Sequence, residues 1–258
     1  MSKKLTWPWS SFIPSWKVFR AISNENEYIA NHIISRDSWP KSNSSVRILD
    51  LGCGDGLLIK QIVMSCNQNV SEVHLLDPDD YLLNEAEKNL KSLKIVKNIL
   101  KTLGYAEEFI DSISINKDVI LAVHIVYFMH CNALKKIFFS IPRSIPIFVV
   151  IDDSTSIFTK IWKISTPKYF KRSIDSHKII KNLPSKNFSV KKTTFLSYVP
   201  DPFFFRDEIR NQLISMLAYA DFDKLLKDKK DKICRIIKEN ENSKKVVCRN
   251  ICYEIIKK

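Results

Sequence analysis

Three of the four glycines in this 258-residue chain lie within five residues, at Gly52, Gly54 and Gly56. At an average usage of about 7%, a chain of this length would hold roughly 18 glycines, so glycine is avoided elsewhere and concentrated here. Glycine adopts positive φ angles and lets another molecule approach the backbone without meeting a Cβ atom. The apolar run Val46 to Leu51 predicts a buried strand before the cluster, and apolar residues at helical spacing follow it. Strand, glycine-rich turn and helix form the first unit of a nucleotide-type α/β fold.

The glycine turn departs from two phosphate-binding patterns. The dinucleotide fingerprint G-x-G-x-x-G would need its third glycine at Leu57, and the Gly-Lys-Ser/Thr of a kinase-type phosphate loop is absent. Asp50 stands beside the turn, where its carboxylate would repel a pyrophosphate but suits a cationic ligand. S-adenosylmethionine carries a sulfonium and an ammonium group and no phosphate. The sequence therefore favours S-adenosylmethionine as the cofactor.

A second acidic residue supports this interpretation. Asp77 ends a second apolar segment, 21 residues after Gly56. An acid at about this distance, at the tip of the second strand, accepts hydrogen bonds from ribose hydroxyls. The alternative is that Asp77 only caps the helix that begins after Pro78. The segment from Asp50 to Gly56 resembles motif I of the class I S-adenosylmethionine-dependent methyltransferases, and Asp77 supports that resemblance.

Strands and helices alternate along the rest of the chain. The apolar runs predict seven strands, at residues 46–51, 72–77, 95–101, 118–123, 146–151, 188–198 and 245–256. Such alternation predicts an α/β fold with a doubly wound, Rossmann-like, mostly parallel seven-stranded sheet. We expect three parts: an N-terminal helical lid at 1–40, a cofactor-binding core at 41–156, and a C-terminal part at 157–258 that completes the sheet and lines the substrate pocket.

Ligands of open parallel sheets lie beyond the carboxyl ends of the strands. Glu107 follows the third predicted strand, near the expected adenine. Val123 and His124 end the fourth strand, beside the expected sulfonium, and Asp152 ends the fifth. We therefore expect Glu107 and Val123 to bind the cofactor.

Beyond these motifs, the chain resembles the histamine N-methyltransferase branch of the class I enzymes over most of its length. The resemblance implies a substrate-binding glutamate in the lid, at or beside Glu27. The segment Asp118 to Phe128 is similar to the branch's fourth-strand motif, which implies that the polar residue at His124 binds substrate. Tyr127, Trp162 and Asn250 match positions that line the branch's substrate pocket. The branch has glutamine where this chain has His124, so the resemblance implies the pocket positions but not histamine itself.

These residues suggest a mechanism of methyl transfer to a nitrogen atom of a small molecule, with oxygen as the alternative acceptor atom. His124 is the candidate base, because the ordinary pKa of histidine, near 6.5, suits proton transfer at neutral pH. Glu27 and Asn250 would orient the substrate, and aromatic side chains would exclude water. Each residue also has a structural interpretation: His124, Tyr127 and Trp162 as core residues, and Glu27 as a solvated helix residue.

The charge distribution leaves a second function open. Residues 1–156 carry 17 basic and 17 acidic residues, whereas residues 157–258 carry 24 and 11, so the net charge of +13 lies in the second segment. An RNA or protein methyltransferase would dock its substrate on such a surface. However, 32 of the 41 basic residues are lysines, the less specific reader of phosphate, and many stand in runs typical of solvated helix faces. A catalytically inactive, cofactor-binding regulator is a further alternative.

The remaining composition argues against other classes. The six cysteines form no C-x-x-C pair, so we expect neither a metal site nor an oxidising compartment. The longest apolar run, Ile145 to Ile151, is far too short to span a bilayer. We therefore expect a cytoplasmic protein with a small-molecule methyl acceptor and no membrane partner.

Overall fold

One continuous sheet organises the chain. The computed structural model describes residues 9–41, 45–113, 116–200, 207–218, 220–242 and 245–258. Seven strands follow the order β3-β2-β1-β4-β5-β8-β6, and a two-residue strand, β7, pairs with β8. The strands are β1 (Val46–Leu51), β2 (Val70–Asp77), β3 (Asn98–Leu103), β4 (Val119–Val123), β5 (Pro146–Asp152), β6 (Phe188–Pro200), β7 (Glu241–Asn242) and β8 (Lys245–Lys257). The strands β1 to β5 pair in parallel, and β8 runs antiparallel to both β5 and β6.

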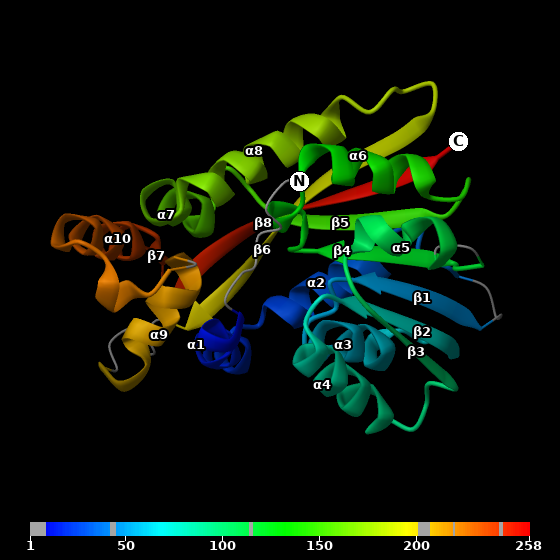
Figure 1. Ribbon diagram of the computed structural model, residues 1–258, viewed down its shortest axis with the longest axis horizontal. Helices are drawn as coiled ribbons and strands as arrows, with labels where there is room; N and C mark the ends of the chain where they lie inside the picture. The colour runs from blue at the N-terminus through cyan, green and yellow to red at the C-terminus, as the bar shows by residue number, and fades with distance from the viewer. Residues whose placement is uncertain (1–8, 42–44, 114–115, 201–206, 219, 243–244) are drawn as a thin grey trace.

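Helices cover both faces of this sheet (Figure 1). One face packs against α2 (Glu25–Ile34), α3 (Leu57–Ser65) and α4 (Asp80–Lys91), and the other against α5 (Ala106–Ile113), α6 (Cys131–Ser140) and α8 (Pro167–Lys181). Along β4, Ile120 and Ala122 belong to one hydrophobic cluster, while Val119 and Leu121 belong to the other. Such alternation follows from the two-residue period of a strand. The predicted doubly wound, mostly parallel α/β sheet is confirmed.

The central strands are uninterrupted apolar runs because helices bury them on both sides. Every residue of β5 is buried, including its last residue, Asp152. A carboxylate at the end of such a strand costs free energy unless it has polar partners. We therefore expect polar partners for Asp152 at the carboxyl end of β5.

The other helices gather at one end of the sheet (Figure 1). They are α1 (Trp9–Ile22), α7 (Ile157–Ser165), α9 (Asp207–Ala218) and α10 (Lys227–Glu239), with short 3-10 turns η1 (Val126–Phe128) and η3 (Phe222–Lys224). The junction of α1 and α2 is fixed to β6, because the Asn24 side-chain oxygen accepts a hydrogen bond from the backbone N–H of Tyr198 at 2.7 Å. No described helix combines the length and apolar character that crossing a bilayer requires.

One of the seven predicted strands was misplaced. The third strand, β3, spans 98–103 instead of 95–101, because it lies at the sheet edge and its half-exposed residues carry no strong apolar signal. The helix α5 lies between β3 and β4 along the chain, and α7 and α8 lie between β5 and β6.

Candidate functional site

The glycine turn follows β1 and adopts the backbone that its composition predicts. Gly52, Gly54 and Gly56 all have positive φ, at +67°, +55° and +72°. A Cβ atom at Gly54 would lie 3.3 Å from the indole ring of Trp16 on α1, so the bare backbone accommodates a ring that closes over it. A Cβ atom at Gly56 would lie 2.8 Å from the Cα atom of Ala86 on α4. Gly56 therefore permits two helices to pack, and it does not line the cavity described next.

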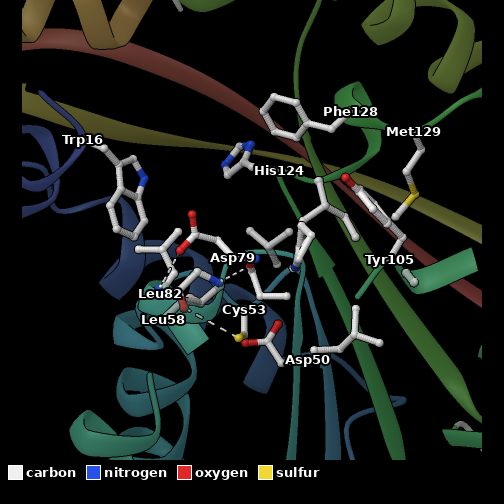
Figure 2. A pocket seen from close by; sticks show the side chains of 18 of the residues that line it. Trp16, Asp50, Cys53, Leu58, Asp79, Leu82, Tyr105, His124, Phe128 and Met129 are labelled. Atoms are coloured by element: carbon white, nitrogen blue, oxygen red, sulfur yellow. Dashed lines mark hydrogen bonds between the residues drawn. The ribbon is translucent and has the colours of Figure 1, made fainter. Parts of the chain in front are cut away.

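A cavity of about 470 Å³ opens beyond the carboxyl ends of β1, β2, β4 and β5. Figure 2 shows Asp50 at its floor, Trp16 on one side, Tyr105 on the other, and His124 with Phe128 above. The glycine-turn half contributes Trp16, Arg20, Asp50, Gly52, Cys53, Gly54, Leu58, Leu76, Asp77, Pro78, Asp79, Leu82, Tyr105, Ala106 and Glu107. The other half contributes Phe19, Glu25, Val123, His124, Ile125, Phe128, Met129, His130, Asp152, Phe158, Tyr169 and Met216.

Two buried carboxyl groups lie in the glycine-turn half. Burial, and secondly the nearby Asp77, raises the pKa of Asp50 to about 8. Burial also raises the pKa of Asp77, to about 6, although backbone N–H groups of Asp79 and Gly54 donate to its two oxygens at 2.9 Å each. At neutral pH, Asp50 is therefore mostly protonated and Asp77 mostly ionised.

Arg20 of α1 brings a positive charge to the same cavity. Its guanidinium lies over the Trp16 ring at 5.2 Å, hydrogen-bonds the Asn26 side chain, and lies 3.8 Å from Asp55 of the glycine turn. Its Nε atom is buried and has no hydrogen-bond partner among the described residues. A donor of this kind is positioned to bind an anionic group of a ligand.

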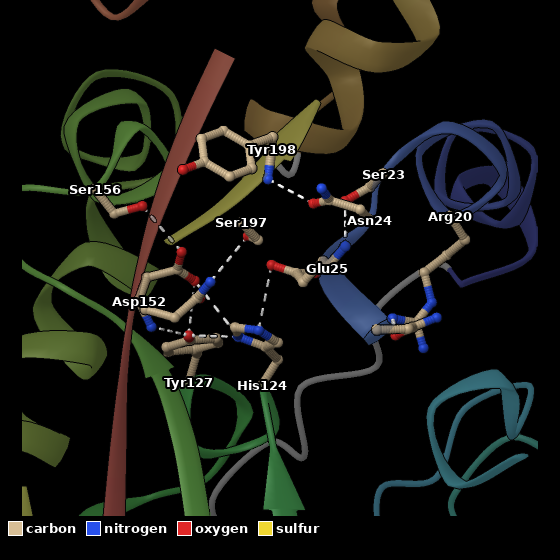
Figure 3. Close-up of polar contacts among 12 residues, drawn as sticks. Arg20, Ser23, Asn24, Glu25, His124, Tyr127, Asp152, Ser156, Ser197 and Tyr198 are labelled. Atoms are coloured by element: carbon tan, nitrogen blue, oxygen red, sulfur yellow. Dashed lines mark hydrogen bonds and ion pairs between the residues drawn. The ribbon is translucent and has the colours of Figure 1, made fainter. Parts of the chain in front are cut away.

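The other half of the cavity is organised around His124, the residue that follows β4 (Figure 3). Its backbone has φ +56°, a left-handed conformation that is uncommon outside glycine and that concentrates at functional sites. Nε2 of His124 lies 3.5 Å from a carboxylate oxygen of Glu25, and Nδ1 lies 3.5 Å from Asp152. The imidazole is thus held between two buried carboxyl groups that come from α2 and β5.

The charges of this cluster are coupled. Burial alone would lower the pKa of His124, but Glu25 and Asp152 outweigh burial and raise it above its ordinary value. Burial would raise the pKa of Glu25, yet the neighbouring His124 lowers it, so Glu25 stays ionised. The pKa of Asp152 is raised to about 6 by burial, against the opposing effect of His124.

Most of the residues predicted from the sequence meet at this cavity. Asp50, Gly52, Gly54, Asp77, Glu107, Val123 and His124 all line it. Tyr127, Trp162 and Asn250 are fully buried and do not line it: Tyr127 bonds to His124, Trp162 packs edge-on against Tyr127, and Asn250 donates to Ser197 at 3.0 Å.

The structure brings Glu25 to the cavity in place of Glu27. Glu25 is buried, whereas Glu27 is exposed on α2 and does not line the cavity. The helical period could have distinguished the two glutamates. Glu25 lies four residues before the buried Ile29 and is therefore on the same face of the helix. Glu27 lies about 200° away around the helix.

The fold is shared with solved methyltransferase structures. A putative methyltransferase from Bacillus halodurans superposes with a TM-score of 0.56 at 12% identity, covering 90% of this chain and 98% of the other. The YcgJ protein of Bacillus subtilis gives 0.54 at 13% identity, covering 89% and 97%. The plantazolicin methyltransferase BamL, crystallised with a desmethyl-plantazolicin analogue and SAH, gives 0.51 at 14% identity, covering 91% and 85%.

No protein-family model and no curated protein matches the sequence. The likeness at 12–14% identity concerns the fold, and the strand order and the glycine turn after β1 agree with it. The chain therefore has the fold of the class I S-adenosylmethionine-dependent methyltransferases.

Proposed function

We propose that this protein transfers the methyl group of S-adenosylmethionine to a nitrogen atom of a small molecule. The glycine-turn half of the cavity supports the cofactor: Asp77 ends β2, where an acid accepts hydrogen bonds from ribose hydroxyls. Asp50 suits the cationic methionine end of the cofactor, and Arg20 suits its carboxylate. Glu107, at the start of α5, lies on the side of the cavity assigned to adenine.

One observation carries the assignment of a nitrogen acceptor: Glu25, His124 and Asp152 are buried together in the other half of the cavity. Two carboxyl groups beside one imidazole favour a positively charged partner, and most aliphatic amines carry a proton at neutral pH. Besides Trp16 and Tyr105 near the glycine turn, the aromatic side chains of Phe19, Phe128, Phe158 and Tyr169 line the cavity. They favour a small, largely apolar acceptor. A hydroxyl oxygen is the second candidate, because the same base serves it.

The arrangement suggests how the residues act. Glu25 and Asp152 attract the protonated amine, and neutral His124 accepts its proton at Nε2. The amine would then have a free lone pair to form the N–CH3 bond, and the bound cofactor would supply the methyl group from its sulfonium, leaving as S-adenosylhomocysteine. Positioning of two reactants in this manner supplies about 7–11 kcal/mol of barrier reduction. A well-placed base adds about 10²- to 10⁴-fold in rate.

The direct test is to incubate the purified protein with methyl-labelled S-adenosylmethionine and a metabolite extract, and to analyse the products by mass spectrometry. The proposal predicts a labelled small molecule that gains one methyl group on nitrogen. Label that appears only in RNA or protein would reject the small-molecule assignment. Tight cofactor binding without product from any acceptor would support the regulator alternative.

Glu25→Gln is expected to raise KM for the acceptor by about 10- to 100-fold, because a buried charged hydrogen bond is worth about 1.5–3 kcal/mol. Glutamine keeps the length of the side chain and removes its charge. Glu27→Gln is the matched comparison, since Glu27 is exposed two residues later on the same helix. Steady-state kinetics with the acceptor found by labelling measures both. If only Glu27→Gln raised KM for the acceptor, the substrate-binding glutamate would be Glu27 and not Glu25.

Cofactor affinity is expected to rise with pH through the titration of Asp50. Because burial raises its pKa to about 8, Asp50 is protonated below that pH, and a cationic ligand must release the proton to gain an ionised partner. Affinity for S-adenosylmethionine should therefore rise by up to about tenfold per pH unit as the pH approaches 8, then level off. Titration calorimetry in buffers with different heats of ionisation measures how many protons are released when the cofactor binds. Asp50→Asn should abolish the release, and a pH-independent affinity of the unaltered protein would contradict the expectation.

The RNA or protein alternative depends on exposed lysines outside the cavity. On α8, Lys168, Lys171 and Lys178 are exposed. None of the lysines that the structure describes lines the cavity, so those of the basic segment do not oppose a cationic acceptor there. Filter binding to RNA with a steep salt dependence would support this alternative.

A further inference from the structure

Tyr127 lies directly behind the base that the proposed function requires. It belongs to η1, three residues after His124, and its side chain is fully buried. Its ring packs edge-on against Trp162, with ring centres 4.9 Å apart, and against Phe128, at 6.2 Å. This packing fixes the direction of the hydroxyl group, which points between His124 and Asp152 (Figure 3).

Three hydrogen bonds link the hydroxyl to His124 and Asp152. Oη lies 2.9 Å from Nδ1 of His124 and 2.8 Å from Oδ2 of Asp152, and it accepts the backbone N–H of Asp152 at 2.6 Å. A tyrosine hydroxyl carries only one hydrogen. An ionised Asp152 has no proton to give, so the hydroxyl donates to Asp152. His124 must then donate from Nδ1 to the tyrosine oxygen.

This series of hydrogen bonds determines which nitrogen of neutral His124 carries the proton. With the proton on Nδ1, the lone pair lies on Nε2, the nitrogen that faces Glu25. Glu25 acts in the opposite direction, because its carboxylate, 3.5 Å from Nε2, attracts a proton to that nitrogen. Arg20 is the third charged group that acts on His124. Its positive charge disfavours the protonated imidazole and so opposes the rise in the pKa of His124.

We propose that Tyr127 is a positioning residue that holds neutral His124 in the Nδ1–H tautomer against the attraction of Glu25, so that Nε2 is free to accept the proton of the acceptor nitrogen. The proposal rests on the function assigned to His124 above. The carboxylate of Asp152 orients the hydroxyl, and the hydroxyl orients the imidazole. In catalytic triads, a carboxylate bonded directly to histidine fixes its tautomer, and here a tyrosine hydroxyl lies between the two.

The surroundings of Asp152 agree with this direction of the hydrogen bonds. Ser156 donates its hydroxyl hydrogen to Oδ1 of Asp152 at 3.1 Å, which leaves Oδ2 for Tyr127. The carboxylate thus accepts on both oxygens, as an ionised group must. His124 has a left-handed backbone, and Nδ1 of its ring lies within 3.5 Å of both Tyr127 and Asp152.

Nitrogen-15 NMR of the histidine rings tests the proposal without an acceptor. In the protein saturated with SAH, at a pH where His124 is neutral, the shifts should report a proton on Nδ1. Tyr127→Phe keeps the packed ring and removes the hydroxyl, and it should produce a mixture of tautomers. The His124→Asn spectrum assigns the signal. A predominant Nε2–H tautomer in the unaltered protein would overturn the proposal.

A second variant reverses the chain of hydrogen bonds. In Asp152→Asn, Ser156 holds the amide oxygen at the Oδ1 position, so the amide nitrogen faces Tyr127 and donates to it. The hydroxyl hydrogen must then point to Nδ1 of His124, and the Nε2–H tautomer should predominate. An unchanged tautomer in this variant would also overturn the proposal. Tyr253→Phe is the matched control, because its hydroxyl is bonded to His177 and not to His124.

Kinetics separates positioning from a general structural role. With the acceptor found by labelling, Tyr127→Phe should lower kcat by about 10- to 100-fold and leave acceptor KM and SAH affinity within about twofold. An equal loss of SAH affinity would indicate a structural role. If no acceptor is ever found, the proposed function fails, while the tautomer measurement still decides the proposal on Tyr127.

Discussion

His124→Asn is expected to lower kcat by about 10²- to 10⁴-fold while leaving SAH affinity within about twofold, since the variant removes the base and keeps the backbone. Asparagine tolerates the left-handed conformation at φ +56° better than alanine does, so a loss of rate is not a consequence of strain. Radiolabel transfer to the acceptor measures kcat, and calorimetry measures the affinity for SAH.

The pH dependence adds a second readout for His124. Because Glu25 and Asp152 raise its pKa, the rate should increase with pH through a value above about 6.5, as the ring loses its proton. This limb should be absent in His124→Asn. His32→Asn is the control: that ring bonds to Thr193 on β6 and does not line the cavity. Unchanged turnover in His124→Asn would reject the assignment of the base.

The sheet could be predicted from the sequence because its central strands are buried on both faces and therefore leave apolar runs. The segments at β1, β4 and β5 are such runs, and the predicted boundaries agree with the structure to within one residue. The helix α1 gave no comparable signal. It contains Pro14 and a mixture of tryptophan, serine and lysine. It packs against α9, which lies about 200 residues later in the sequence. Contacts of that kind are decided by tertiary structure.

The cofactor half of the cavity was more predictable than the acceptor half for a related reason. Asp50, the glycines and Asp77 follow strands directly, so the ends of parallel strands bring them together. Glu25 reaches the cavity from α2, and no local pattern places that helix opposite β4. The burial of Tyr127, Trp162 and Asn250 behind the cavity wall likewise depends on how α7 and β8 pack, which residue identity alone does not reveal.

The strongest expected effect on cofactor binding comes from Asp77, which has two tasks in the structure. Its carboxylate accepts the backbone N–H groups of Gly54 and Asp79, and so it joins the glycine turn to the start of α4. It also lines the cavity at the end of β2, where the ribose of the proposed cofactor would lie. Asp79, the next acidic residue that lines the cavity, caps α4 by accepting from the backbone N–H of Leu82 at 3.0 Å. The two carboxylates are therefore separable by their partners.

Asp77→Asn is expected to weaken SAH binding by about 10- to 150-fold, since a hydrogen bond to a charged group contributes about 1.5–3 kcal/mol. Asparagine keeps the volume and retains an oxygen for one backbone N–H, so the sheet should still form, and circular dichroism checks this. Asp79→Asn keeps a good helix cap and should lose far less affinity. Calorimetric titration of SAH into both variants distinguishes them. If Asp77→Asn bound SAH strongly and Asp79→Asn lost affinity for SAH, the ribose contact would belong to Asp79. The carboxylate that binds the ribose would then be the one that caps α4, and not the one at the end of β2.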